Sequence, residues 1–116
     1  MSAGLTTHVL DTSSERPASG VEVTLRRLDG ADGTETVATA TTNADGRVDE
    51  PLLTAAEMTT GTYELLFDVG AYYRQQSRGS SFLETVPVRF VISEPEEHYH
   101  VPLLLSPGGY TTYRGS

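Results

Sequence analysis

Short segments of alternating apolar and polar residues recur along the chain. The clearest is 21–28, in which Val21, Val23 and Leu25 form the apolar set. A period of two residues is typical of a β-strand with one buried face, so this set is predicted to face a core. Further segments rich in apolar and β-branched residues predict strands at 5–10, 35–42, 62–69 and 86–93. In the last of these, Pro87 argues for an edge or strand-entry position, because proline has no N–H to donate.

The segment 98–116 is predicted to add two more strands and to be built into the fold. It begins His-Tyr-His-Val-Pro-Leu-Leu-Leu, turns at Pro-Gly-Gly and returns as Tyr-Thr-Thr-Tyr-Arg. Soluble domains often end in a frayed polar tail, whereas this segment is β-rich and aromatic. Its core face would carry Tyr99, Val101, Leu103 and Leu105. The side chains of His98 and His100 then leave the opposite, outer face.

Turn and helix signals separate these strands. Asn43-Ala-Asp-Gly-Arg47 predicts a tight turn whose Asp-Gly pair supplies a positive-φ position. Residues 54–57 have capping-box spacing, which indicates a short helical turn. Segment 70–78 loses the period of two and predicts the one true helix, two or three turns long and closed by Gly79. The expected fold is therefore all-β: a two-sheet antiparallel sandwich with about eight strands and one short helix.

The length and composition of the chain limit the class of protein. With 116 residues, the chain is expected to be a single domain, 1–116, that can bury a core without cross-links. It has no cysteine, so disulfides and thiolate–metal sites are excluded, which fits a reducing compartment. No apolar run approaches the roughly 20 residues that span a bilayer, and the start of the chain lacks the pattern of a secretory signal. We expect a cytoplasmic protein with no membrane partner.

The charge balance is acidic, with a formal net charge of −8 from 16 acidic and 8 basic residues. Because phosphate binding requires a basic patch, nucleic acid is not an expected partner. All the basic residues other than histidine are arginines, so each is a local cation in a negative background.

Histidines on the outer face are the first candidates for chemistry. By pattern alone, His98 and His100 can be exposed strand residues without a role. The same pair could hold zinc with His8 as a third ligand, although no carboxylate or fourth group stands at a matching spacing. Arg47 can likewise be an ordinary turn residue, and Tyr113 an edge-strand residue. The chain has no nucleophile elbow, phosphate loop or cysteine–histidine pair.

Four segments together resemble one enzyme family. They are 5–11 (Leu-Thr-Thr-His-Val-Leu-Asp), 43–47, 98–107 and the ending Tyr-Arg-Gly-Ser at 113–116. These match 5-hydroxyisourate hydrolases, the transthyretin-like enzymes of urate breakdown. The resemblance runs over essentially the whole chain, although 49–84 carries little of it. The Tyr-Arg-Gly-Ser ending is the most specific part, since transthyretin itself, a hormone carrier of the same fold, lacks this ending and the histidines.

The resemblance implies a fold, an assembly and a reaction. The fold is the transthyretin-like sandwich. The assembly is a homotetramer, a dimer of dimers with active sites in a channel where the dimers meet. The reaction, part of purine catabolism, is hydrolysis of the cyclic amide C–N bond of 5-hydroxyisourate to 2-oxo-4-hydroxy-4-carboxy-5-ureidoimidazoline. No metal or organic cofactor is implied. The alternative is a non-catalytic carrier that binds a small aromatic ligand in the same channel.

Site residues follow from the resemblance, position by position. The implied catalytic residues are His8, Arg47 and His100. The implied substrate-binding residues are His8, Arg47, His98, Tyr113, Arg114 and Ser116, with 114–116 closing the pocket. As a hypothesis, a neutral imidazole of His8 or His100 takes a proton from the attacking water while Arg47 stabilises the oxyanion. The assignment of base and acid between the two histidines stays open. Polar residues on an outer face line a cleft only when another subunit covers them.

Overall fold

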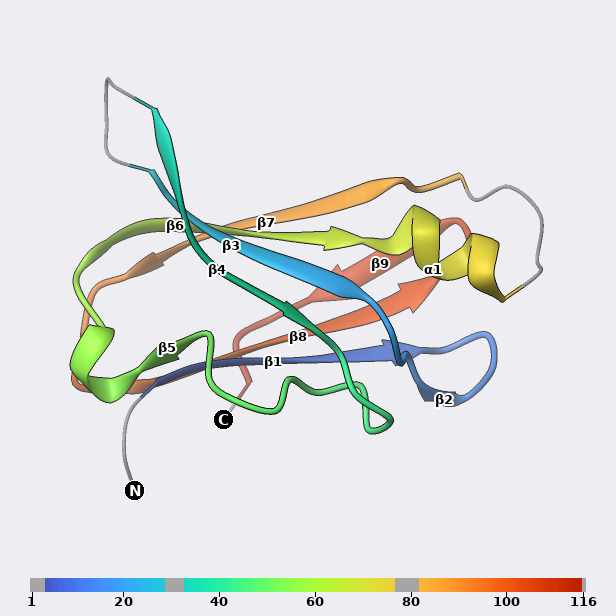
Figure 1. Cartoon of the computed structure of the whole chain (residues 1–116), viewed down its shortest axis with the longest axis horizontal. Helices are drawn as coiled ribbons and strands as arrows, with labels where there is room; N and C mark the ends of the chain where they lie inside the picture. The colour runs from blue at the N-terminus through green and yellow to red at the C-terminus, as the bar shows by residue number, and fades with distance from the viewer. Residues whose placement is uncertain (1–3, 29–32, 77–81, 116) are drawn as a thin grey trace.

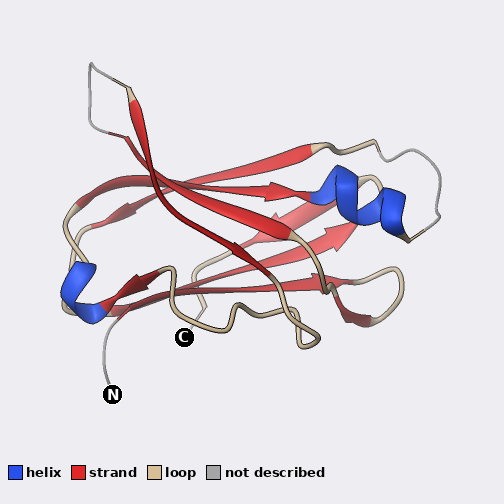
Figure 2. Ribbon diagram, viewed as in Figure 1, coloured by secondary structure: helices blue, strands red, loops and turns tan. Residues whose placement is uncertain are grey.

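Two facing β-sheets form the protein (Figure 1; Figure 2), and the computed structural model describes residues 4–28, 33–76 and 82–115. Sheet A has the strand order β2-β1-β8-β9, with β5 paired to β1, and sheet B has the order β4-β3-β6-β7. The strands of sheet A are β1 (Gly4–Asp11), β2 (Arg16–Pro17), β5 (Leu53–Thr54), β8 (His98–Ser106) and β9 (Gly109–Thr112). Those of sheet B are β3 (Glu22–Leu28), β4 (Thr34–Thr41), β6 (Gly61–Asp68) and β7 (Thr85–Ile92).

The predicted all-β sandwich is confirmed, with one difference in strand direction. Within the described residues there are nine strands, and two of them, β2 and β5, are only 2 residues long. All strand pairs are antiparallel except β1 with β8, which are parallel. Alternation reports which face a residue occupies but not the direction of a neighbouring strand, so the sequence pattern could not distinguish this pair.

Buried apolar side chains from both sheets form one core between them. Val21, Val23 and Leu25 are fully buried, as their alternation predicted. The apolar face of β8 is buried as well. The largest fully buried side chains are Tyr63, Tyr73, Phe67, Leu5, Leu25, Leu65, Ile92, Leu103 and Leu105. Burial of a side chain of this size stabilises the fold by about 1.5–3 kcal/mol relative to exposure. Because the inner positions of sheet A face this core, its outer positions are the ones that can contact a ligand.

The one α-helix of the described residues, α1, spans Val69–Gln75. It begins at the last residue of the predicted strand, because the Asp68 side chain accepts a hydrogen bond from the Ala71 N–H at 3.2 Å and caps the helix. The predicted closing residue, Gly79, lies outside the described residues. No helix in the described parts of the chain has the length and apolar character that crossing a bilayer requires.

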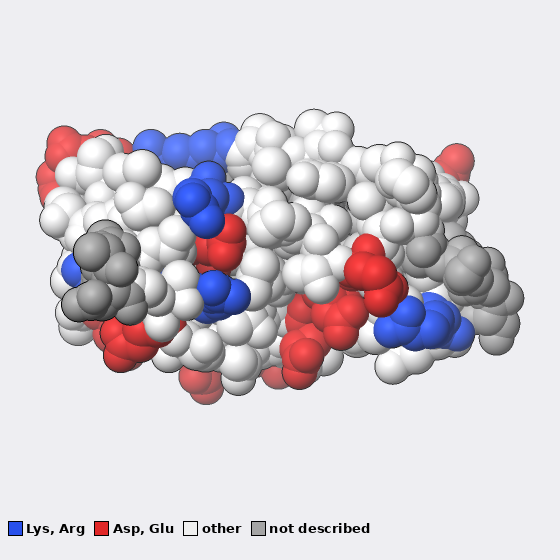
Figure 3. Space-filling model, turned by 90° about the horizontal axis from the view of Figure 1, so that it is seen from above, with Lys and Arg blue, Asp and Glu red and all other residues white. Residues whose placement is uncertain are grey.

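Local signals in the loops were also predicted correctly. A short 3-10 helix, η2, spans Ala55–Glu57, and the Glu57 carboxylate accepts a hydrogen bond from the Thr54 N–H at 2.9 Å. Pro87 lies in β7, which is one of the two edge strands of sheet B. On the face seen in Figure 3, basic side chains form separate patches, several of them beside acidic ones. An ion pair joins Arg89 on β7 to Glu64 on β6 at 3.4 Å.

Candidate active site

The turn at 43–47 is docked against β1, and this places Arg47 beside His8. Gly46 accepts a hydrogen bond from the Val9 N–H at 2.8 Å, and an isolated antiparallel bridge joins His8 to Arg47. Gly46 has a φ of +77°, the left-handed conformation that the Asp-Gly sequence predicted. A Cβ at this position would also overlap the Val9 carbonyl oxygen. The turn therefore requires glycine for two separate reasons.

The ring of His8 is oriented by the same turn. Its Nε2 lies 2.9 Å from the main-chain oxygen of Asp45. A carbonyl oxygen only accepts, so Nε2 carries the proton and donates it. In the neutral ring, Nδ1 then keeps its lone pair. His8 thus has one nitrogen engaged in positioning and one available to a ligand.

The parallel pairing of β1 with β8 brings Thr6 between the other two histidines. Thr6 is the register partner of His100. Its Oγ1 lies 2.8 Å from Nδ1 of His100 and 3.3 Å from Nε2 of His98. The two imidazole rings are stacked, with centroids 6.4 Å apart and planes at 11°. The centroids of the His8 and His100 rings are 6.5 Å apart.

Thr6, His98 and His100 border a hollow of about 310 Å³ on the outer face of sheet A. Its lining residues are Thr6, Thr7, Arg47, Val48, His98 and His100. The rings of His8 and His100 are half-buried, whereas His98 is exposed. Both strand histidines lie on the outer face, as alternation predicted.

The surroundings keep His8 and His100 neutral. Burial is the largest cause and lowers the pKa of His8 below its ordinary value, and the Arg47 guanidinium lowers it further. The hydrogen bond to Asp45 opposes this shift. The pKa of His100 is also lowered by burial first, then by the charges of Arg47, His8 and His98. Neutral imidazoles beside a permanent cation suit proton abstraction next to a bound anion.

The C-terminal segment reaches the site through Gly115. Its N–H donates to the His100 carbonyl oxygen at 2.7 Å. A Cβ on Gly115 would stand 2.8 Å from Cδ2 of His100, which is too close for a real contact. The segment 113–115 therefore lies directly against the edge of the His100 ring, and only glycine fits there.

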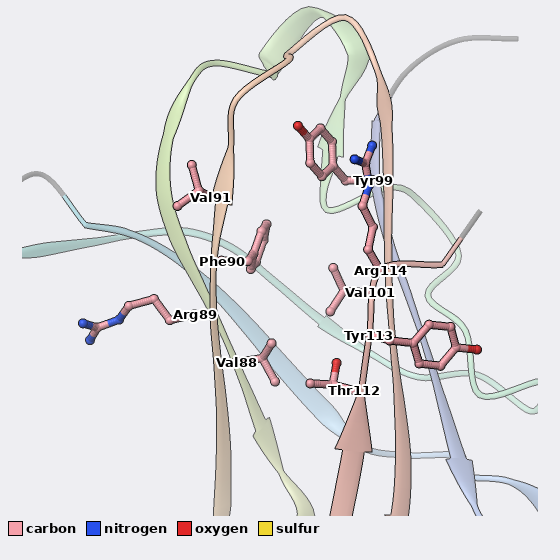
Figure 4. Close-up of a pocket in the computed structure, with 9 residues that line it drawn as sticks. All are labelled: Val88, Arg89, Phe90, Val91, Tyr99, Val101, Thr112, Tyr113 and Arg114. Carbon is pink, nitrogen blue, oxygen red and sulfur yellow. The ribbon is translucent and has the colours of Figure 1, made fainter.

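The other terminal residues lie differently. The guanidinium of Arg114 stacks on the Tyr99 ring at 4.0 Å and donates to Glu97 Oε1 at 3.2 Å and to the His98 carbonyl oxygen at 2.9 Å. Tyr113 is 54 % exposed and its ring points away from the β7 side chains in Figure 4. Neither residue lines the histidine hollow, so their substrate-binding roles stay predictions. Ser116, also predicted to bind substrate, lies outside the described residues.

A second hollow lies between the edge strands β7 and β9 (Figure 4). Its lining residues are Val88, Arg89, Phe90, Val91, Tyr99, Val101, Thr112, Tyr113 and Arg114. The lining is mainly apolar, and it carries no histidine. This hollow is distinct from the site described above and lies where both sheets end.

Two contributions to the site were missed from the sequence. The first is Thr6, whose hydroxyl contacts both strand histidines. Thr6 precedes His8 by two residues and so lies on the same face of β1, but only the parallel register with β8 reveals its partners. The second is the main-chain oxygen of Asp45, and no side-chain motif signals such a group. The structure brings His8, Arg47 and His100 together, as the resemblance implied.

A metal site at the three histidines has no geometric support. In the described parts of the chain, no group of three or more His, Asp or Glu side chains is placed to hold a metal ion. His8 directs Nε2 to Asp45 and His100 directs Nδ1 toward Thr6. These contacts explain the ring orientations without a bound ion.

Comparison with known proteins gives the class to which this fold and site belong. The chain belongs to the HIUase/Transthyretin family, whose model matches residues 5–115. A curated relative from Rhizobium meliloti (strain 1021), 5-hydroxyisourate hydrolase 2, is 54% identical over 118 residues, covering 99% of this chain and 98% of the relative. The mouse 5-hydroxyisourate hydrolase is 46% identical over 116 residues, covering 99% of this chain and 97% of the relative.

Solved structures of a 5-hydroxyisourate hydrolase and of a thyroxine-bound transthyretin share this fold. The 5-hydroxyisourate hydrolase of Klebsiella pneumoniae matches with a TM-score of 0.83 and 41% identity, over 98% of this chain and 99% of that chain. Sea bream transthyretin in complex with thyroxine matches with a TM-score of 0.87 and 34% identity, over 97% of this chain and 95% of that chain. Since the fold is common to both, the side chains of the site must distinguish the two functions.

Proposed function

We propose that this protein hydrolyses 5-hydroxyisourate, opening its six-membered ring at the cyclic amide C–N bond. The product is 2-oxo-4-hydroxy-4-carboxy-5-ureidoimidazoline, and the reaction is a step of urate catabolism. The observation that carries the proposal is that Arg47 and His100 line one hollow, from the 43–47 turn and β8, while His8 on β1 is bridged to Arg47 and lies with its ring 6.5 Å from that of His100. The full-length identity to curated hydrolases supports the same reaction.

The chemistry divides between a base and a cation. A neutral imidazole takes a proton from water as the oxygen attacks the ring carbonyl, and such proton transfer contributes roughly 10²–10⁴ in rate. Arg47 holds the electron-rich substrate and stabilises the developing oxyanion. Of the two half-buried histidines, His8 retains Nδ1 for the substrate and His100 retains Nε2. This chemistry requires no metal or organic cofactor.

A homotetramer, assembled as a dimer of dimers, is part of the proposal because the hollow is open in a single subunit. Strands β7 and β9 end the two sheets on the same side, and an unpaired strand edge is a template for pairing with another chain. Exposed Val91, at 61 %, and Tyr113 lie on that side. We propose that these edges form the dimer and that the outer faces of sheet A from two dimers enclose the site. Tyr113, Arg114 and Ser116 would contact substrate in that closed channel.

The alternative is a carrier that binds a small aromatic ligand without turnover, on the analogy of the thyroxine-bound transthyretin. A carrier gains nothing from a cluster of neutral imidazoles beside an arginine, so the hydrolase is favoured. The test mixes purified protein with freshly prepared 5-hydroxyisourate and follows its ultraviolet absorbance. Loss faster than the spontaneous rate is expected, whereas saturable binding without acceleration would favour the carrier. A cytoplasmic location stays a prediction from the sequence.

A further inference from the structure

We propose that Thr6 is a positioning residue that relays a proton between His100 and His98 during the reaction. The inference rests on the proposed hydrolase function and extends it to a residue outside the implied site. It also assigns His100 as the base. The observation behind it is a single hydroxyl placed between two imidazole nitrogens.

The geometry restricts the protons of the three groups. A threonine hydroxyl has one hydrogen to donate, so with two imidazole neighbours it donates to one nitrogen and accepts from the other. The Oγ1 distances are 2.8 Å to Nδ1 of His100 and 3.3 Å to Nε2 of His98. If Nδ1 of His100 carries its proton, the chain runs from His100 to Thr6 to His98. The free Nε2 of His100 is then a lone pair available to a water molecule.

The direction of relay follows from the charges around His100. A proton held by His100 would create an imidazolium between the Arg47 cation and two other histidines, and burial adds to that cost. In the single subunit the ring of His98 is more exposed than that of His100, so a charge there loses less of its hydration. Passing the Nδ1 proton onward leaves His100 neutral and moves the charge to the less buried ring. The same chain therefore lets His100 accept a proton that its surroundings disfavour.

The proton and electron balance closes in two steps. In the first, the water oxygen forms a bond to the ring carbonyl carbon and the water proton goes to Nε2 of His100. The Nδ1 proton of His100 moves to Oγ1 of Thr6, whose own proton moves to Nε2 of His98. The products are a tetrahedral oxyanion beside Arg47 and an imidazolium at His98. In the second step the C–N bond breaks, the leaving nitrogen takes the proton from Nε2 of His100, and the chain runs back.

Variants at Thr6 test the relay in the full-length protein. Thr6→Val removes the hydroxyl at nearly constant shape, and valine suits a strand. We expect it to lower kcat by roughly 10–100-fold with little change in KM, since it blocks proton transfer rather than binding. Thr6→Ser keeps the hydroxyl and should keep most of the turnover. Thr24→Val is the matched control, a half-buried threonine on β3 of sheet B, and should behave as wild type.

A proton inventory in mixtures of light and heavy water separates a relay from a packing effect. The wild-type kcat should vary along a curve with deuterium fraction, because more than one proton moves. For Thr6→Val the dependence should be a straight line. His98→Gln should give a similar loss, and the double variant should lose no more than either single one. His98 is exposed, so this variant tests the relay even if Thr6→Val fails to fold.

Several results would overturn the relay. They are undiminished turnover in Thr6→Val, an equal loss in Thr6→Ser, a curved inventory that persists in Thr6→Val, or losses that multiply in the double variant. Each presupposes that the wild type accelerates hydrolysis of 5-hydroxyisourate. A wild type without turnover would instead reject the proposed function, so the two failures are distinguishable.

Discussion

Gly115 and His100 are joined by a main-chain bridge in which the Gly115 N–H donates to the His100 carbonyl oxygen at 2.7 Å. The two residues belong to the end of the chain and to the middle strand pair of sheet A. The contact holds the terminal segment against the edge of a ring that we assign as the base. It thereby fixes the C-terminal segment beside His100.

Replacing Gly115 by alanine should therefore damage activity more than folding. The new methyl would stand 2.8 Å from Cδ2 of His100, so either the ring or the terminal segment must move. A displacement of this kind can cost about 10²-fold in rate. The comparison is Gly108→Ala in the β8–β9 turn, where a Cβ meets nothing within 4 Å. Steady-state kinetics and thermal unfolding measure the two effects, and equal activity of the two variants would contradict the role of the contact.

Arg47 should extend the acid limb of the pH–rate profile to lower pH, in addition to the larger effect of burial. Because the pKa values of His8 and His100 are lowered, both rings stay neutral as the pH falls below about 6.5. Activity should then decline only toward the lowered pKa values. In Arg47→Met, the Arg47 charge is gone but burial remains, so the pKa values should rise part of the way back. The acid limb of kcat/KM should move to higher pH.

Arg47→Lys is the matched variant for this measurement, because it keeps the positive charge and loses the planar guanidinium. Its acid limb should stay near that of the wild type. Both variants should lose roughly 10²–10³ in kcat through weaker oxyanion stabilisation. An Arg47→Met profile with an unmoved acid limb would show that its charge does not act on the histidines.

The turn that presents Arg47 should be intolerant of any side chain at Gly46. Alanine there meets both a positive φ and the Val9 carbonyl oxygen. Gly33 separates the effect of the positive φ from that of the close approach, since its φ is +101° but a Cβ there has open space. We expect Gly33→Ala to cost about 1–2 kcal/mol of unfolding free energy. Gly46→Ala should cost about 1–3 kcal/mol more, from overpacking. Urea unfolding compares them, and equal losses would mean that the close approach does not matter.

The edge of β7 should be needed for assembly. Val91→Asp places a charge at a 61 % exposed apolar position beside the hollow of Figure 4. Burying an unpaired charge in an interface is unfavourable, so this variant should show a lower mass in solution than the tetramer that we propose for the wild type, and lower activity. Val37→Asp is the control, an exposed valine on β4 at the opposite edge of sheet B. Light scattering measures both, and an unchanged mass for Val91→Asp would reject this edge as an interface.

Much of the fold could be predicted from alternation, because the period of two residues identifies the buried face without knowledge of the neighbours. The placement of Val23 in the core and of His100 on the outer face followed from it. The left-handed Gly46 followed from the Asp-Gly pair. Alternation could not show which strands pair or in which direction, because strand pairing depends on contacts between residues distant in sequence. The parallel pairing of β1 and β8 belongs to this class, and Thr6 was missed with it.

The terminal residues show the limit of a resemblance. It implied that Tyr113 and Arg114 bind substrate, which stays a prediction; in the single subunit Arg114 contacts Tyr99 and Glu97. A motif identifies residues that matter to a family but does not say in which assembly they meet. Gly115 was included only as part of the closing segment 114–116. Its contact with His100 joins residues 15 positions apart and depends on how the chain folds back after β9.

The most direct test of the central claim is to run the reaction in ¹⁸O-labelled water and follow the ring-opened product by mass spectrometry. Labelled product should form faster with wild-type protein than without protein. It should carry one labelled oxygen, in the new carboxyl group. His100→Ala should lower that rate to near the spontaneous one. Labelled product that forms no faster with wild-type protein than without it would contradict the account.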